Sequence, residues 1–255
     1  MNDNKTSLEG RGIVVTGAAS GIGRSGAIIA ARRGARVLVT DVNEDGGQET
    51  VEIIRKEGGE AAFERVDISA EDDVKRMVRR TVELYGRLDG AFNNAALPQV
   101  TSMAHDLSVA QWQRNVAVTL TGTFICMKYE IEEMLKNRAG AIVNTSSGAG
   151  LRGFAMGSEY ASAKFGVVGL TRTSAIEYGP HGLRINSVSP GAVRTPMLIA
   201  AMENDPDLEP YINKTNPMGR MAHPDEIGEA AAWLLSDAAS FVTGAVLAVD
   251  GGHLA

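Results

Sequence analysis

Short apolar runs alternate along the chain with longer stretches in which apolar residues recur at helical spacing. The short runs predict seven strands, at residues 12–17, 36–41, 61–67, 88–95, 140–146, 183–190 and 244–251. The longer stretches predict helices near residues 22–34, 44–58, 71–86, 107–136, 157–178 and 224–236. Alternation of this kind is typical of an α/β protein in which helices cover both faces of a parallel sheet.

One segment interrupts the alternation. Residues 192–222 contain no clean strand pattern and hold four prolines, so we expect a long irregular insertion. Such insertions in compact domains are usually functional, and we interpret this one as a substrate lid. A plain surface excursion is the alternative. Because no Pro- or Gly-rich linker divides the chain, residues 1–255 are expected to form a single domain.

Composition excludes several classes of function. The net charge of −6 gives no basic surface for nucleic acid, and no run approaches the roughly 18 apolar residues of a membrane span. The first ten residues lack the apolar core of a secretory signal. The single cysteine, Cys126, lies in an apolar helical stretch, which predicts a buried inert thiol and a cytoplasmic location. Four scattered histidines have no metal-ligand spacing, so no metal is expected.

A glycine-rich sequence, TGAASGIG at residues 16–23, joins the first predicted strand to the first predicted helix. Gly17 permits a tight turn, Gly21 lets a phosphate approach the backbone, and Gly23 allows the helix to pack closely on the strand. This arrangement predicts a dinucleotide pyrophosphate at the helix N-terminus. The spacing G-x-x-x-G-x-G differs from the common G-x-G-x-x-G, so a structural turn is the alternative.

An acidic residue, Asp41, ends the second predicted strand 18 residues after Gly23. A carboxylate at this position accepts hydrogen bonds from the adenosine ribose and repels a 2′-phosphate. Neither Ser20 nor Val42 offers a compensating positive charge, so NAD is predicted rather than NADP. The alternative is that Asp41 only caps the next helix or turn.

Two further strand ends carry weaker signals. Asp67 follows the third predicted strand, where it meets an adenine amino group or merely supports a turn in which Ser69 and Asp72 form a capping box. The sequence NNAA, residues 93–96, ends the fourth strand. Small residues and an amide suit a cofactor crevice, although paired Asn residues are also common in turns.

The sequence YASAK places Tyr160 and Lys164 four residues apart, one turn along a predicted helix. That spacing alone does not distinguish an acid–base pair from an ordinary helix face. Two serines, Ser146 and Ser147, end the fifth predicted strand, and Tyr160 follows Ser147 by 13 residues.

These motifs occur in order, continuing into PGAVRTP and a closing VDGG, and over almost its whole length the chain resembles the short-chain dehydrogenase/reductase family. The resemblance is to the compact single-domain, NAD-dependent branch. It implies a Rossmann-type doubly wound parallel sheet, interconversion of a secondary alcohol and a ketone, and a homotetramer.

The resemblance also implies residue roles. Ser147 would bind the substrate oxygen, Tyr160 would be the general acid/base, and Lys164 would bind the nicotinamide ribose and lower the Tyr160 pKa. Because a free tyrosine has a pKa of about 10, a value near 7 needs roughly 4 kcal/mol of preferential stabilisation of the phenolate. The other cofactor contacts implied are Gly17, Ser20, Gly21, Ile22, Gly23, Asp41, Val42, Asp67, Ile68, Asn94, Ala95, Pro190, Gly191, Val193 and Thr195.

Two positions depart from the family pattern. Thr119 stands in VTLTG where the family has Asn in V-N-x-x-G, and Ala96 replaces the Gly of NNAG. The family's Asn holds a water of the proton relay. We hypothesise that the Thr119 hydroxyl holds it here; the alternative is that this hydroxyl bonds to the carbonyl of Asn115. Two rival functions remain open: a non-catalytic NAD-binding redox sensor, and an enzyme of a different reaction such as dehydration or epimerisation.

Overall fold

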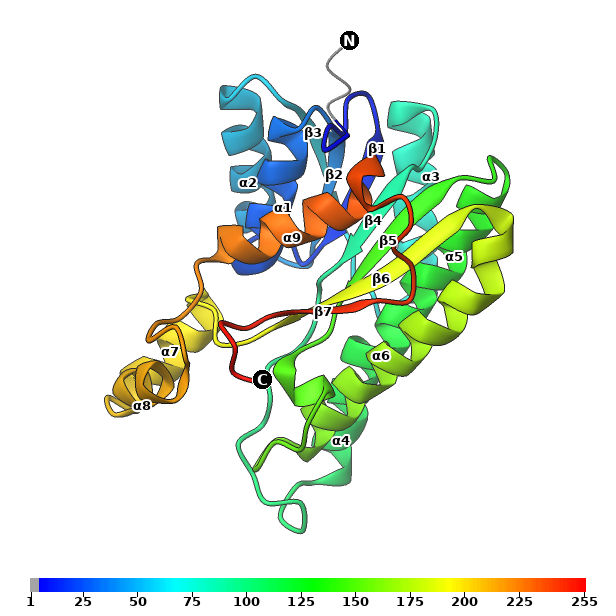
Figure 1. Cartoon of the computed structure of the whole chain (residues 1–255). Coiled ribbons are helices and arrows are strands. Elements are labelled where there is room, and N and C mark those ends of the chain that lie inside the picture. Colours follow the sequence, from blue (N-terminus) through cyan, green and yellow to red (C-terminus); the bar gives the residue numbers. More distant parts are fainter. Residues whose placement is uncertain (1–4) are drawn as a thin grey trace.

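The sheet contains seven parallel strands in the order β3-β2-β1-β4-β5-β6-β7 (Figure 1). The computed structural model describes residues 5–255. Residues 1–4, which open the segment where no secretory signal is expected, lie outside the described residues. The predicted doubly wound α/β architecture is confirmed, because the chain starts at the centre of the sheet and builds outwards in both directions from β1 and β4.

The strands begin and end within two residues of their predicted limits. They are β1 Gly12–Thr16, β2 Arg36–Asp41, β3 Glu60–Arg65, β4 Gly90–Asn93, β5 Gly140–Thr145, β6 Leu183–Pro190 and β7 Val246–Val249. The two central strands, β1 and β4, are buried along their whole length, as expected for strands covered on both faces.

The helices also follow the predicted pattern. They are α1 Gly21–Arg32, α2 Glu44–Lys56, α3 Glu71–Tyr85, α4 Val109–Val116, α5 Thr123–Leu135, α6 Ser158–Tyr178 and α9 Pro224–Leu235. Helix α4 begins at a capping box of Ser108 and Gln111, and α9 at one of His223 and Glu226. The helix predicted over 107–136 contains a π-helical turn, Ala117–Gly122, between α4 and α5.

Two apolar layers hold the helices against the sheet. Helices α1, α2 and α9 cover one face through side chains such as Ile29, Val51 and Leu234. Helices α3, α5 and α6 cover the other face, where Met77 and Cys126 are fully buried. The prediction of a buried Cys126 is therefore confirmed, and burial raises the pKa of its thiol.

The expectation of an irregular insertion at 192–222 is wrong. This segment forms two helices, α7 Pro196–Asn204 and α8 Leu208–Thr215, which stand away from the sheet (Figure 1). Its prolines do not prevent this, because Pro196 is the first residue of α7 and Pro210 lies in the first turn of α8, where no helical N–H bond is lost. Neither helix has a buried residue.

No helix within residues 5–255 has the length and apolar character needed to cross a bilayer.

Candidate active site

A cleft with a volume of about 600 Å³ opens where the carboxyl ends of β1, β2, β3 and β4 meet. Ligands of doubly wound sheets bind at this edge, beside the strands between which the chain changes direction. The predicted residues that line the cleft are Gly17, Ser20, Gly21, Ile22, Asp41, Val42, Asp67, Ile68, Asn94, Ala95, Tyr160, Lys164 and Thr195. The predicted residues outside its lining in the described chain are Gly23, Thr119, Ser147, Pro190, Gly191 and Val193.

The glycine loop gives this cleft an exposed backbone. Gly17 and Gly21 have φ of 65° and 55°, a region that disfavours side chains. An added Cβ at Gly17 would lie 2.8 Å from Ala95 Cα, and one at Gly23 would collide with the Gly17 carbonyl. Ser20 precedes α1 without a side-chain bond to it, so the first N–H groups of α1 have no side-chain partner among residues 5–255. A backbone with free donors at a helix N-terminus fits a pyrophosphate.

Asn94, which directly follows the neighbouring strand β4, holds the glycine loop in place. Its Nδ2 donates to the carbonyl oxygens of Thr16 at 3.3 Å and Gly17 at 3.2 Å. Its backbone N–H donates to the Thr16 hydroxyl at 3.0 Å, and the Thr145 hydroxyl donates to Asn94 Oδ1 at 3.5 Å. The amide predicted to lie beside the cofactor therefore also holds the loop in place.

Asp41 joins the glycine loop to the turn that follows β2. Its Oδ2 accepts the Ala19 N–H and its Oδ1 accepts the Asn43 N–H, both at 2.9 Å. The N-cap of α2 is Asn43, so Asp41 supports the turn without capping the helix. A nearby cation, Arg24, donates to the Ala19 carbonyl and pairs with Glu49, each at 2.5 Å, so its charge is already matched.

The turn after β3 differs from one alternative interpretation. The N-cap of α3 is Ala70, without a side-chain bond, so the suggested capping box of Ser69 and Asp72 is wrong. The Ser69 side chain instead donates to Asp67 Oδ1 at 2.6 Å, and the Ser69 N–H donates to the same oxygen at 2.9 Å. Asp67 thus supports this turn while it also lines the cleft.

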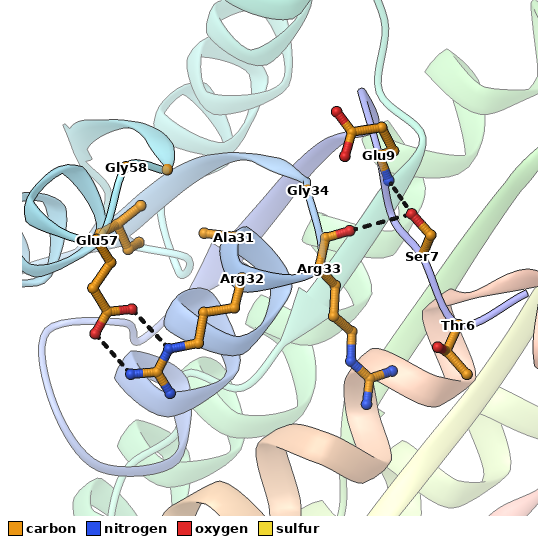
Figure 2. Close-up of a pocket in the computed structure, with 11 residues that line it drawn as sticks. Thr6, Ser7, Glu9, Ala31, Arg32, Arg33, Gly34, Glu57 and Gly58 are labelled. Carbon is orange, nitrogen blue, oxygen red and sulfur yellow. Dashed lines mark hydrogen bonds and ion pairs between the residues drawn. The ribbon is translucent and has the colours of Figure 1, made fainter. Parts of the chain in front are cut away.

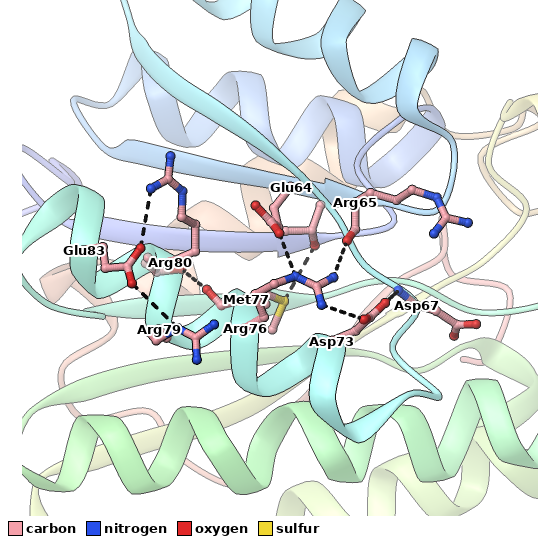
Figure 3. A network of polar contacts seen from close by, with 11 residues as sticks. Glu64, Arg65, Asp67, Asp73, Arg76, Met77, Arg79, Arg80 and Glu83 are labelled. Atoms are coloured by element: carbon pink, nitrogen blue, oxygen red, sulfur yellow. Dashed lines mark hydrogen bonds and ion pairs between the residues drawn. The ribbon is translucent and has the colours of Figure 1, made fainter.

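An ion-pair network that includes Arg76 and Asp73 of α3 holds the turn after β3 in place (Figure 3). Arg76 on α3 contacts Asp73 and Glu64, each at 2.8 Å. Asp73 in turn accepts the Asp67 N–H at 3.0 Å. That N–H, together with Arg76, holds the pKa of Asp73 below its usual value. The part of the cleft that Asp67 lines therefore has an anchored backbone.

Three predicted catalytic side chains meet at the end of β5. Tyr160 and Lys164 lie one turn apart on α6 and both face the cleft. Lys164 Nζ lies 5.6 Å from the centroid of the Tyr160 ring and donates to the Thr145 carbonyl at 2.6 Å. The Ser147 hydroxyl interacts with the Tyr160 side chain and accepts the Ala149 N–H at 3.2 Å.

Burial shifts the pKa values of both titratable groups towards their neutral forms. It raises the pKa of Tyr160, which the Ser147 hydroxyl opposes, and it lowers the pKa of Lys164 to about 7. In the protein alone the phenol is therefore protonated at neutral pH. The predicted lowering of the Tyr160 pKa thus needs positive charge that is added when the cleft is filled.

The segment after β6 closes the cleft over the glycine loop. An added Cβ at Gly21 would lie 3.2 Å from Thr195 Cγ2, so Thr195 is placed directly against the loop. Gly191 packs against Asp250, since an added Cβ there would lie 2.9 Å from Asp250 Cα. Val193 is buried. Gly191 and Val193 therefore shape this wall without lining it.

Thr119 lies fully buried in the π-helical turn, an irregularity that is frequent at functional sites. Its hydroxyl accepts the Leu97 N–H at 3.2 Å, and its carbonyl accepts the Thr123 hydroxyl at 2.9 Å. Within residues 5–255 its hydroxyl makes no hydrogen bond to the Asn115 carbonyl, so that alternative is not realised. The hydroxyl proton remains available to donate.

One buried group beside the site was not predicted. Glu159 precedes Tyr160 on α6, is fully buried, and accepts the Val100 N–H at 2.6 Å. A glutamate in a helical pattern is normally read as solvent-facing, because ionised residues are rarely buried. The sequence therefore contains no signal that separates Glu159 from a surface residue.

A second depression, of about 440 Å³, lies at the opposite end of the sheet and contains none of the predicted site residues (Figure 2). Its cations are matched by acids: Arg32 pairs with Glu57 at 2.7 Å, and Arg33 pairs with Glu229. These pairs explain its polar lining without a ligand.

Comparison with known proteins agrees with this geometry. The family model described as enoyl-(acyl carrier protein) reductase matches residues 17–253. A 2,5-dichloro-2,5-cyclohexadiene-1,4-diol dehydrogenase of Sphingobium indicum is 50% identical over 249 residues, covering 97% of this chain and 98% of that protein. A cyclohexanol dehydrogenase of an Acinetobacter species is 42% identical over 240 residues, covering 94% and 93%.

Solved structures extend the similarity to three dimensions. Levodione reductase superposes with a TM-score of 0.92 at 37% identity, covering 96% of this chain and 97% of that one. A structure from Agrobacterium tumefaciens with bound NADP gives a TM-score of 0.90 at 32% identity, covering 99% of both chains. The chain belongs to the short-chain dehydrogenase/reductase family. It is thus an oxidoreductase of a family that interconverts alcohols and ketones with a nicotinamide cofactor.

Proposed function

We propose that the chain is an NAD-dependent oxidoreductase that interconverts a cyclic secondary alcohol and its ketone, with Tyr160 as the general acid/base. The observation that carries this proposal is that Tyr160 and Lys164 line the cleft that the glycine loop borders, with the Ser147 hydroxyl bonded to the Tyr160 side chain. It disfavours a non-catalytic redox sensor, which needs the cofactor cleft but has no use for a phenol held beside the Ser147 hydroxyl.

Each side chain has a distinct task in this proposal. Tyr160 exchanges the hydroxyl proton of the substrate, and Ser147 holds the substrate oxygen. Lys164, when charged, favours the phenolate and would also hold the nicotinamide ribose. Thr119 would anchor a relay water with its free hydroxyl proton. The nicotinamide cofactor supplies the hydride acceptor or donor.

NAD is favoured over NADP by the charges at the end of β2. The Asp41 carboxylate lies at the cleft, where it would repel a 2′-phosphate. Arg24 is paired with Glu49, and the adjacent Val42 is uncharged and exposed. A relative of 32% identity binds NADP, so the choice within the family depends on such local charges.

An apolar ring is favoured as the substrate because the cleft and the segments before α4 and α6 expose apolar side chains. Met197 of α7 lines the cleft and is 52% exposed. Met103, Phe154 and Met156, in the segments before α4 and α6, are also exposed. Two relatives are named for cyclic alcohols, which supports the same class.

Three further properties are proposed together with this function: a lid, an oligomeric state and a cellular location. Residues 192–222, with helices α7 and α8, would form a lid whose apolar side chains close over the ring. Phe165 and Ile176 lie on one exposed face of α6, 45% and 79% exposed, which supports a homotetramer built through this helix. The cytoplasm remains the predicted location.

The direct test is to mix the purified protein with NAD⁺ and a matched set of alcohols, and to follow NADH absorbance. Cyclohexanol should be oxidised faster than a linear secondary alcohol or a primary alcohol. Tyr160→Phe serves as the inactive control. Absence of turnover with every alcohol and with the matching ketones and NADH, together with tight NADH binding, would favour the redox sensor instead.

A further inference from the structure

The segment that follows β4, residues 97–102, begins at the cleft and ends beside Gly157, which directly precedes α6. Ala95, Ala96 and Leu97 line the cleft together with Tyr160. Residues 97–101 belong to no helix or strand, and Ser102 forms an isolated bridge with Gly157. Their position therefore depends on individual bonds to the body of the protein.

Three buried polar side chains supply those bonds, each from a different helical element. Thr119 Oγ1 accepts the Leu97 N–H at 3.2 Å, and Asn115 Nδ2 donates to the Pro98 carbonyl at 3.0 Å. Glu159 Oε1 accepts the Val100 N–H at 2.6 Å. All three residues are at most 2% exposed: Thr119 0%, Glu159 0% and Asn115 2%.

These contacts are the sole side-chain hydrogen bonds of Thr119, Asn115 and Glu159 within residues 5–255. The second oxygen of the Glu159 carboxyl and the Asn115 carboxamide oxygen are buried without a partner in the same range. Burying a carboxyl and an amide with incomplete bonding is unfavourable. Their placement is therefore explained by what they hold, which in each case is the same short segment.

A second loop shares this attachment. The Ser102 N–H donates to the Met156 carbonyl at 3.2 Å, and Met156 adopts a left-handed backbone with φ of 60°. Residues with such backbone angles are found where the surrounding structure fixes them. Because Glu159 stands next to Tyr160, one carboxyl couples residues 97–102 to the helix that carries the phenol.

We propose that Glu159 is a positioning residue for the reaction: together with Asn115 and Thr119 it sets the distance between residues 97–102 and Tyr160, and thereby decides which alcohols fit. It acts through the segment and does not touch the substrate. This inference rests on the proposed alcohol–ketone function.

The kinetic test compares three variants with cyclohexanol and with a linear secondary alcohol. Glu159→Ala should raise the alcohol KM and reduce kcat/KM by about 10²-fold, the usual effect of a small misplacement in an active site. Glu159→Gln keeps an oxygen that accepts the Val100 N–H, so it should recover most of this loss. The matched control is Glu177→Ala, which removes an exposed carboxyl from the same helix.

Two further measurements separate positioning from folding. The NADH dissociation constant should stay within about twofold of wild type in Glu159→Ala, because the adenine side of the cleft does not depend on this bond. Should that variant fail to fold, Asn115→Ala takes its place with the same expectation, since it removes the donor to Pro98. The proposal is overturned if the folded variant behaves like Glu177→Ala, or if NADH binding falls as far as turnover.

Amide hydrogen exchange tests the anchor without any activity. The Val100 N–H should be protected in wild type and in Glu159→Gln, and should lose at least about tenfold of its protection in Glu159→Ala while amides in the middle of α6 keep theirs. If wild type oxidises no alcohol, the proposed function fails, but this measurement still decides whether Glu159 holds the segment. Unchanged protection of Val100 overturns the inference.

Discussion

The side-chain nitrogen of Lys164 lies 5.6 Å from the centre of the Tyr160 ring and donates a hydrogen bond to the Thr145 carbonyl at the end of β5. One buried amine thus connects the helix that carries the phenol to the edge of the sheet where the cleft opens. The two side chains share a low-dielectric site, so the charge of one strongly affects the proton affinity of the other.

Tyr160→Phe should separate chemistry from binding. The change removes one hydroxyl and leaves a ring of the same shape in the same wall of the cleft. Turnover should fall by at least about 10²-fold, while the NADH dissociation constant, followed by fluorescence, stays near wild type. Lys164→Ala should lose both, because the amine serves the phenol and the ribose. Substantial residual turnover in Tyr160→Phe would assign the proton transfer elsewhere.

Lys164 should also make the stability of the cofactor-free protein depend on pH. Burial lowers the pKa of Lys164 from about 10.5 to about 7 in the native state. The native state then binds fewer protons than the unfolded state, so the destabilisation grows as pH falls through this range and is complete below about 7. Relative to wild type, the free energy of unfolding of Lys164→Met should increase by up to roughly 1.4 kcal/mol for each unit that the pH falls from about 9 to 7.

Urea unfolding at several pH values measures this gain. The exposed Lys56→Met provides the control, which should show a constant difference from wild type. A pH-independent difference for Lys164→Met would show that the buried amine stays charged over the whole range, as it is in the unfolded chain.

Glu130 should produce a dependence of the opposite sign. Its Oε2 accepts a hydrogen bond from Asn93 at 2.8 Å, yet burial raises the pKa of Glu130 to about 8. The native state then holds the extra proton, and stability is lost as pH rises from about 4.5 to about 8. Glu130→Gln should abolish this loss, of roughly 1.4 kcal/mol per pH unit at most.

The same unfolding series checks this expectation, with the exposed Glu52→Gln as control. Equal slopes for wild type and Glu130→Gln between about pH 5 and 8 would mean that the carboxyl is not protonated in the fold.

The fold was predictable because its signals are local and repeated. A fully buried strand such as β1 appears as a continuous apolar run, and an amphipathic helix such as α3 as a 3.6-residue period. The position of the cleft was predictable for a similar reason, since it forms where strands end and the chain turns. Gly17 and Asp41 stand at such ends, so their positions along the chain already place them together.

The features that escaped prediction depend on contacts between distant segments. The π-helical turn at Ala117–Gly122 lies inside a continuous helical stretch and is distinguished by its hydrogen bonding. Prolines at 196 and 210 suggested irregular chain, although at helix starts they are compatible with helix. Glu159 accepts a hydrogen bond from the N–H of Val100, which is distant in the sequence, and no local sequence pattern indicates that contact.

Cofactor choice is expected to favour NAD. The Asp41 carboxylate already accepts two backbone N–H groups and would repel a 2′-phosphate at the cleft. The ratio of kcat/KM for the two cofactors, on one alcohol, measures this preference. Combining Asp41→Ser with Val42→Arg should shift the ratio towards NADP by at least about tenfold, through loss of repulsion and gain of a cation. Higher kcat/KM with NADP in wild type would falsify the prediction.

The last prediction concerns the buried hydroxyl of Thr119. This hydroxyl accepts the Leu97 N–H and keeps its own proton free to donate to a relay water, so one atom serves two purposes. Thr119→Val removes both the acceptor for the Leu97 N–H and the donor for the relay water. A lost relay water lowers kcat by about 10²-fold and leaves the alcohol KM unchanged. Displacement of segment 97–102 raises the alcohol KM in addition, as expected for Glu159→Ala.

Thr119→Asn completes the comparison, because its amide oxygen can accept the Leu97 N–H while its nitrogen donates to the water. We expect this variant to match or exceed wild-type turnover, and Thr119→Val to lose kcat with NADH binding intact. If Val at this position is harmless and Asn115→Ala loses kcat with the alcohol KM unchanged, the water is held by Asn115. If wild type turns over no alcohol or ketone and Thr119→Asn restores activity, then the relay is broken in the natural chain, which acts as a cofactor sensor.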